Sequence, residues 1–173
     1  PRSTLFPYTT LFRSRGSLDG LKVVFVGEVT NLGRSWLEAA ARFPIEVTQV
    51  APQDWLATSS ELEGLRSHAA GQLSISTDLE AALQGADVLY TDCWPKTDVP
   101  QEKERIRQAF LPYQILPKHL DALAENAFFL PCPPVTRGEE VSVEAMTSPL
   151  CRNHPAKAYL LHAQNAVMAF LSK

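Results

Sequence analysis

The chain has 173 residues, of which 45% are apolar and 20% charged, and its formal charge is −3. These values predict a single soluble domain that is large enough to bury a core. The mildly acidic charge and scattered basic residues argue against nucleic acid as a partner, and no apolar run approaches membrane-spanning length, about 20 residues. Three cysteines, an odd number without framework spacing, indicate a reducing compartment, so we expect a cytoplasmic protein.

Residues 1–14 do not join the pattern that follows them. From Thr4 to Ser14 the sequence resembles the translation of a common sequencing adapter. A targeting peptide is the alternative, but there is no continuous apolar stretch and no small-residue cleavage site before Leu18. We therefore treat residues 1–14 as an artefactual, unstructured tail, and we expect the natural sequence upstream of Arg15 to be missing.

From Leu21 onward, segments with the period of a β-strand alternate with segments with the period of an α-helix. Strands are expected at residues 21–26, 46–50, 73–76, 86–91 and 127–130. Helices are expected at residues 31–43, 59–70, 101–110, 118–125 and about 155–172, with one more short helix that ends at Gly85. The pair Ser59–Ser60 is expected to cap the helix at residues 59–70, and Thr77 with Glu80 is expected to cap the short helix that ends at Gly85.

This alternation predicts an α/β fold: a Rossmann-like doubly wound parallel sheet of about five strands, with helices on both faces. In such folds the ligand lies beyond the carboxyl ends of the strands, where the strand order reverses. Three loops are therefore candidates for the site, at residues 27–33, 92–100 and 131–140.

The loop from Gly27 to Gly33 could bind a phosphate at a helix N-terminus, as in a dinucleotide-binding domain. Its glycine spacing is G-x5-G rather than G-x-G-x-x-G, and Val50-Ala51-Pro52 offers no acidic residue for a ribose hydroxyl. A nicotinamide-dependent oxidoreductase is therefore disfavoured. Asn31 either belongs to a binding loop or simply caps the helix.

Asp92 follows the fourth strand, where a carboxylate is costly to desolvate unless a cation or several donors meet it. We expect a ligand anchor; the alternative is a carboxylate that is bonded to neighbouring backbone amides. The run Pro131-Cys132-Pro133-Pro134 would deliver Cys132 to the rim of the sheet, and its Pro133–Pro134 bond could be cis. The alternative is a rigid turn with an inert, packed thiol.

Cys132, Cys151 and His154 include a Cys-x-x-His fragment of a zinc pattern, but no second ligand pair has matching spacing. We therefore expect no metal and no cofactor.

Several strings in combination resemble the ornithine carbamoyltransferase family, within the aspartate/ornithine carbamoyltransferase superfamily, in order from Leu18 to Lys173. The resemblance is to the second, C-terminal domain, which binds the amino acid. It implies that residues 15–173 form this domain, and that the N-terminal carbamoyl-phosphate domain with its Ser-x-Arg-Thr-Arg loop is missing. The strings are residues 18–23, 27–35, 85–92, 112–114, 137–141 and 161–164.

The resemblance implies carbamoyl transfer from carbamoyl phosphate to the side-chain amine of ornithine or a related amino acid, in an enzyme that is a homotrimer when full length. By position, Asn31 would hold the carboxylate of the amino acid and Asp92 its α-ammonium. Cys132 would line the site of the attacking amine and, with Asp92, help to remove its proton, while the Cys132 and Pro133 carbonyls orient it. Lys96 and Thr97 occupy the family's substrate-binding loop. The fragment alone is expected to be inactive.

Three positions depart from the family pattern. Lys96-Thr97-Asp98 stands where the family has Ser-Met-Gly, Pro131 replaces a histidine that can donate to the carbamoyl oxygen, and Leu160 replaces an arginine. Lys157, one helical turn earlier, is the nearest cation that could contact carbamoyl phosphate, and Arg152 is another.

Two alternatives therefore stay open beside the carbamoyltransferase: a relative without catalysis that serves as a binding or regulatory subunit, and the nicotinamide-dependent domain. The last helix is apolar nearly all round, so we also expect exposed apolar surface on it, where the family's missing domain would pack.

Overall fold

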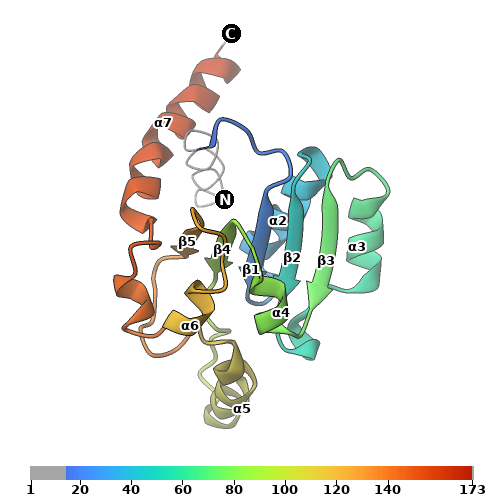
Figure 1. Ribbon diagram of the computed structural model, residues 1–173. Helices are drawn as coiled ribbons and strands as arrows, with labels where there is room; N and C mark the ends of the chain where they lie inside the picture. Colours follow the sequence, from blue (N-terminus) through green and yellow to red (C-terminus); the bar gives the residue numbers. More distant parts are fainter. Residues whose placement is uncertain (1–14, 173) are drawn as a thin grey trace.

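The computed structural model describes residues 15–172, except for the side chains of residues 154, 155 and 157–161. Its centre is a five-stranded sheet in the order β3-β2-β1-β4-β5, and every neighbouring pair is parallel (Figure 1). Each strand lies within two residues of its predicted segment, which confirms the predicted sheet. The strands are β1 (Lys22–Val26), β2 (Glu46–Val50), β3 (Gln72–Ser76), β4 (Val88–Thr91) and β5 (Phe128–Pro131).

Successive residues of β1 point to opposite faces of the sheet, and both faces are buried. Val23 and Phe25 belong to one core cluster, whereas Val24 and Val26 belong to a second one. A parallel sheet needs helices on both faces, because its crossovers run over them, so its strands are apolar on both sides.

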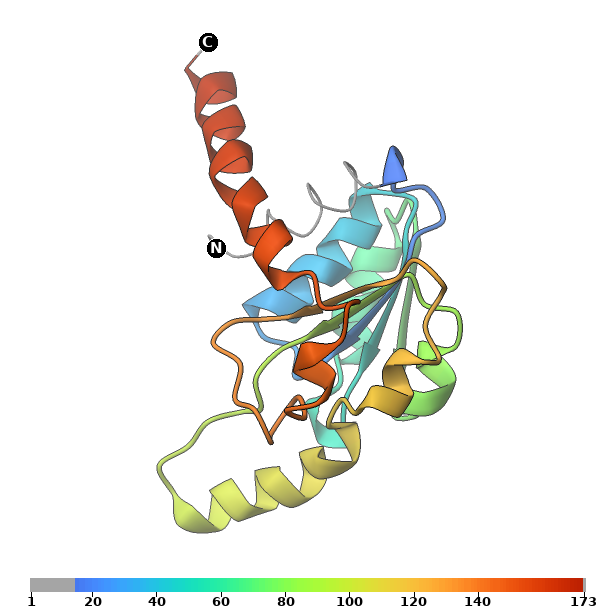
Figure 2. The ribbon, with the colours of Figure 1, turned by 60° about the vertical axis from the view of Figure 1, so that its left-hand side comes forward.

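Helices cover the two faces as the sequence predicts. The first cluster contains side chains of α2, α3 and the start of α7, and the second contains side chains of α4 and α6. Figure 2 shows α2 on one side of the sheet and α4 and α6 on the other. The doubly wound architecture is therefore confirmed. The helices are α2 (Asn31–Arg42), α3 (Ser59–Arg66), α4 (Leu79–Leu83), α5 (Pro100–Phe110), α6 (Pro117–Leu120) and α7 (Asn153–Leu171).

Two helix caps were predicted at the wrong residue. Thr58, not the Ser59–Ser60 pair, caps α3, because its side chain accepts from the Glu61 backbone N–H and Glu61 bonds back in a full capping box. Asp78, not Thr77, caps α4, and its Oδ1 accepts from the Ala81 backbone N–H at 2.9 Å. In both cases the true cap is one residue from the predicted one.

The helix predicted at residues 118–125 is only the four-residue α6, and α3 ends at Arg66 rather than at Ala70. Beyond α6 the backbone bonds to the segment that leads into β4: the Ala122 carbonyl accepts from Gly85, and the Ala124 N–H donates to Ala86. These tertiary bonds replace the i→i−4 bonds that a longer helix would make.

α5 and α7 extend beyond the sheet at opposite ends of the molecule (Figures 1 and 2). The base of α5 is fixed by aromatic packing, in which the Phe110 ring lies 5.1 Å from that of Trp55 and 6.2 Å from that of Trp94. The far half of α7 exposes Met168, Phe170 and other apolar side chains, as the sequence predicts. Among the described residues, no helix combines the length and the apolarity that a bilayer crossing requires.

Candidate functional site

The candidate site lies where β1 and β4 end side by side. The chain runs from β1 outward to β2 and β3, and then returns to place β4 on the other side of β1, so the order reverses between these two strands. The loop after β1 leads into α2, and Asp92 follows β4 directly. This is the location at which doubly wound sheets bind ligands.

A hydrogen bond joins the two loops across this reversal point. The Thr30 hydroxyl donates to Asp92 Oδ2 at 3.0 Å. The other carboxylate oxygen, Oδ1, accepts from the Cys93 backbone N–H at 2.9 Å. The predicted alternative, a carboxylate bonded to neighbouring backbone, therefore describes one of its two oxygens. Each oxygen keeps further acceptor capacity for a ligand cation.

Gly27 permits the close approach of the β1 loop to Asp92. Its φ is +151°, and a Cβ at this position would lie 3.2 Å from Asp92 Cβ. A side chain here would therefore strain the backbone and displace the carboxylate.

Asn31 is the first residue of α2 and is exposed, whereas Thr30 is the cap, whose Oγ1 accepts from the Leu32 N–H at 3.4 Å. The alternative that Asn31 merely caps the helix is therefore wrong, and its amide is not used in that way. Asn31 directly follows the residue that bonds Asp92, so these two candidates lie on adjoining loops at the same edge of the sheet.

Cys132 directly follows β5, the strand that pairs with β4, and its backbone N–H continues the β4–β5 ladder by donating to Thr91 O at 2.8 Å. The side chain is half-buried, and the Pro133–Pro134 bond is cis, as the sequence allowed. Burial raises the pKa of the Cys132 thiol to about 11, although a hydrogen bond with Tyr90 lowers it and Asp92 raises it further. The thiol is therefore protonated at neutral pH, and a part in removing the amine's proton stays a prediction.

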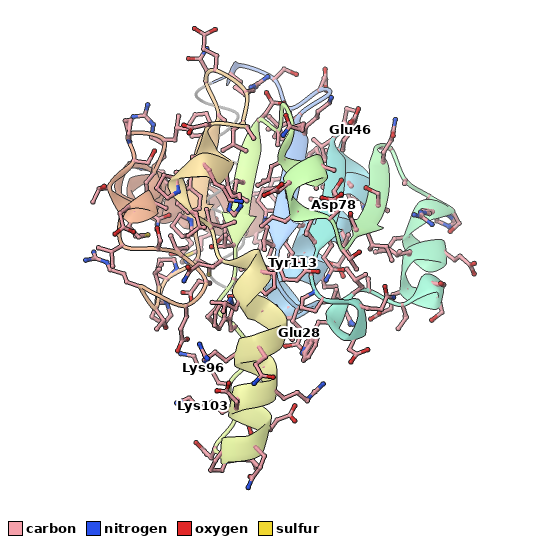
Figure 3. The ribbon with its side chains drawn as sticks, turned by 60° about the horizontal axis from the view of Figure 1, so that its bottom comes forward. Glu28, Glu46, Asp78, Lys96, Lys103 and Tyr113 are labelled. Atoms are coloured by element: carbon pink, nitrogen blue, oxygen red, sulfur yellow. The ribbon has the colours of Figure 1, made fainter. Side chains whose placement is uncertain are left out.

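Lys96 and Thr97 line a cavity of about 440 Å³ beside the loop that follows Asp92, together with Lys103 of α5 and Glu139. Figure 3 shows Lys96 and Lys103 on the same side of α5. Asn31, Asp92 and Cys132 are not part of this cavity lining. Of the sequence candidates whose side chains are described, four lie at the strand ends and two line the adjoining cavity, so they do not share the lining of one pocket: Asn31, Asp92, Cys132 and Pro133 at the strand ends, and Lys96 and Thr97 in the cavity.

Glu140 was not singled out by sequence reasoning, yet its carboxylate is buried beside the site. The side chain is 3% exposed, and its Oε1 accepts from the Thr136 N–H at 2.6 Å. Oε2 is buried without a hydrogen-bond partner in the described structure. Burial raises the pKa of this carboxyl group, whereas the Thr136 N–H and, more weakly, the charge of Lys96 lower it.

Gly33 and Gln49 have structural roles beside the loop that follows β1. A Cβ on Gly33 would lie 2.7 Å from Phe25 Cε1, so this glycine allows α2 to pack on β1. The Gln49 side-chain amide near the end of β2 bonds within the protein: it donates to the Gly27 and Trp55 carbonyls, each at 2.9 Å.

Lys157 and Arg152 are the two cations that could act in place of the family arginine at position 160. The side chains of Lys157 and Leu160 lie outside the described residues, as does that of His154. Arg152 lines a cavity with residues 125–128, which lead into β5 at the strand end opposite Cys132. Arg152 is therefore not the replacement that the sequence suggested. Among the described side chains, no three His, Cys, Asp or Glu residues are grouped as metal ligands would be.

Comparison with known proteins gives consistent matches. The profile of the aspartate/ornithine carbamoyltransferase Asp/Orn binding domain matches residues 19–171. Ornithine carbamoyltransferase of Chlorobaculum tepidum is 34% identical over 171 residues, which cover 99% of this chain and 51% of that protein. The chloroplastic ornithine carbamoyltransferase of Pisum sativum is 34% identical over 159 residues, 92% of this chain and 42% of its own length.

A solved structure agrees with the sequence matches. The ornithine carbamoyltransferase from Pyrococcus furiosus superposes with a TM-score of 0.88 at 28% identity, and the match covers 98% of this chain and 55% of that one. The chain thus spans about half the length of the relatives it matches. With the profile match over most of its length, the chain belongs to the aspartate/ornithine carbamoyltransferase family, of which it comprises the C-terminal Asp/Orn binding domain.

Proposed function

We propose that this chain is the amino-acid-binding half of an enzyme that transfers a carbamoyl group from carbamoyl phosphate to the side-chain amine of ornithine or a related amino acid. The observation that carries the proposal is the Asp92 carboxylate, which is held at the reversal point of the sheet by Thr30 and the Cys93 N–H. Family membership supplies the reaction class, since the matched relatives are named ornithine carbamoyltransferases.

In the proposed complex, Asp92 binds the α-ammonium of the acceptor and Asn31 binds its carboxylate. The carbonyls of Cys132 and Pro133 accept hydrogen bonds from the side-chain amine, and Lys96 and Thr97 close the site from the cavity side. A carboxylate attracts an ammonium group strongly where water is partly excluded, which the half-buried position of Asp92 provides.

The reaction joins the amine nitrogen to the carbonyl carbon of carbamoyl phosphate and breaks the bond from that carbon to the phosphate oxygen. The amine loses one proton, and the products are a ureido group and phosphate. Only the neutral amine attacks, and Asp92 is the acceptor proposed to receive the proton. Holding both reactants in one site can remove about 7 kcal/mol or more of the barrier.

The carbamoyl-phosphate domain is proposed to precede Arg15, with residues 15–173 as the acceptor domain and residues 1–14 as a tail foreign to it. We propose that the full-length protein is a homotrimer. The three cysteines of this chain, Cys93, Cys132 and Cys151, are free and favour a reducing compartment such as the cytoplasm.

A second candidate is a family relative that binds amino acids but has lost catalysis. Pro131 favours it, because this residue is buried in β5, where a family histidine would present a donor to the carbamoyl oxygen. Leu160 favours it as well, since it replaces a cation. Both candidates require amino-acid binding, and only the first requires turnover.

Calorimetric titration of the chain with L-ornithine, L-lysine and putrescine tests the shared part. We expect ornithine to bind, and Asp92→Asn to weaken it by about 10-fold or more, the value of a hydrogen bond to a charged group. Asp54→Asn is the matched control, because Asp54 is an exposed carboxylate that pairs with Arg105 at 3.7 Å. If none of the three amines binds the unaltered chain, the proposal is wrong.

A colorimetric ureido assay separates the two candidates. With carbamoyl phosphate and ornithine, the full-length protein is expected to form citrulline, whereas the chain of residues 1–173 alone is expected to form none. Ornithine binding without citrulline from the full-length protein would support the inactive relative. Turnover by the isolated chain would contradict the division of the site between two domains.

A further inference from the structure

The Thr30 hydroxyl has a double function at the start of α2. Its oxygen accepts from the Leu32 N–H at 3.4 Å, which caps the helix. The same hydroxyl donates a hydrogen bond to Asp92 Oδ2, with 3.0 Å between the two oxygens, and this bond links residues that are 62 positions apart in the sequence. One side chain therefore ties the N-terminus of α2 to the carboxylate that follows β4.

An ordinary capping threonine on the same sheet face provides a comparison. Thr58 caps α3 by accepting from the Glu61 N–H at 3.3 Å, and its hydroxyl donates to Glu61 Oε2 at 2.8 Å. All of these contacts stay within the first turn of α3. Thr30 differs because its hydroxyl donates outside its own helix, to the carboxylate that follows β4.

The geometry points to Thr30 as a positioning residue for acceptor binding, an inference that rests on the function proposed above. We propose that its hydroxyl fixes the Asp92 carboxylate and thereby the distance between Asp92 and Asn31. Asn31 follows Thr30 directly as the first residue of α2. The bond therefore sets the spacing between the group for the α-ammonium and the group for the carboxylate of one amino acid.

The Thr30 bond matters because it restricts the orientations that the Asp92 carboxylate can adopt. With Oδ1 on the Cys93 N–H and Oδ2 on Thr30, the carboxylate is held from both sides of the reversal point. Gly27 borders it, since a Cβ there would lie 3.2 Å from Asp92 Cβ. Without the hydroxyl, one oxygen loses its donor, and part of the binding free energy must then orient the side chain.

The test uses Thr30→Val, which keeps the shape but removes the donor, Thr30→Ser, which keeps the hydroxyl, and Thr58→Val as the control that removes an ordinary cap. Calorimetry measures L-ornithine and 5-aminopentanoate, which lacks the α-ammonium. Thermal unfolding is followed for every variant, because both valine variants lose a helix cap and should melt at a lower temperature for that reason alone.

We expect Thr30→Val to weaken ornithine binding about 10-fold, the value of one hydrogen bond to a charged group, and 5-aminopentanoate binding less than about 2-fold. Thr30→Ser should restore ornithine affinity to within about 2-fold, and Thr58→Val should leave it unchanged to the same margin while lowering the melting temperature. Equal losses for both ligands, no loss in Thr30→Val, or an equal loss in Thr58→Val would overturn the inference. Failure of the unaltered chain to bind ornithine would instead overturn the proposed function on which it rests.

Discussion

The buried carboxyl group of Glu140 provides a sharp test of the account of the site loops. Glu140→Gln keeps an oxygen for the Thr136 N–H, which Oε1 accepts at 2.6 Å, and removes the charge from Oε2, which has no partner in the described structure. Glu140→Ala removes the acceptor as well. Glu139→Gln is the control, because this neighbouring side chain is half-exposed.

Burial raises the pKa of Glu140, so the folded protein keeps this proton to a higher pH than the unfolded chain does. The group's contribution to stability is therefore fully present below its ordinary pKa of 4.5, and it is lost as pH rises through the raised value. Glu140→Gln has no charge to acquire at this position. As pH rises above 4.5, the free energy of unfolding of the unaltered chain should therefore fall relative to that of Glu140→Gln.

The expected loss for Glu140→Ala follows from the Thr136 N–H, which would be left without its acceptor. Such a group costs about 1–3 kcal/mol, which lowers the melting temperature by about 2–12 °C for a domain of this size. Urea unfolding between pH 4 and pH 8 measures all three variants. Parallel pH curves for the unaltered chain and Glu140→Gln would contradict this prediction. A curve for Glu139→Gln that diverges as much as that of Glu140→Gln would also contradict it, because the Glu139 charge is a smaller cause of the raised pKa than burial.

Two further predictions concern packing and the thiol. Gly71→Ala should destabilise the fold by about 1–3 kcal/mol or more, because a Cβ would lie 2.1 Å from the Ile45 carbonyl oxygen, whereas Gly64→Ala in α3 meets nothing within 4 Å and should be neutral or stabilising; equal unfolding midpoints in urea would contradict this. Cys132 should react with iodoacetamide about 200-fold more slowly at pH 8 than a thiol of ordinary pKa, since only about 0.1% is thiolate, with a rate that rises about tenfold per pH unit. Fast, pH-independent labelling in peptide mass spectrometry would show that the raised pKa is wrong.

The sheet could be predicted from the sequence because apolar runs of strand length alternate with helical periods, and a parallel sheet buries both faces of such strands. Asp92 and Cys132 could be predicted as neighbours for the same reason, since each follows a strand and parallel strands end at one edge. Asp92 is further marked by its charge, which is unusual at the end of an apolar strand.

Other parts of the site depend on tertiary contacts that no local pattern encodes. Thr30 precedes Asn31, and both are good capping residues, so only the bond to Asp92 reveals which one faces the sheet. Glu139 and Glu140 are identical in type and adjacent, and only the fold of their loop makes one half-exposed and the other 3% exposed. The shortened α6 likewise results from backbone bonds to Gly85 and Ala86, which lie far away in sequence.

The most direct test of the central claim is a chemical-shift map of the isotope-labelled chain during titration with L-ornithine. The proposed site predicts saturable shifts at residues 27–31, 92–97 and 132–133, and their loss in the Asp92→Asn variant. Saturable shifts confined to another surface, such as the cavity between α2 and α3 lined by Arg34 and Glu61, would contradict it. The same holds for a map that Asp92→Asn leaves unchanged.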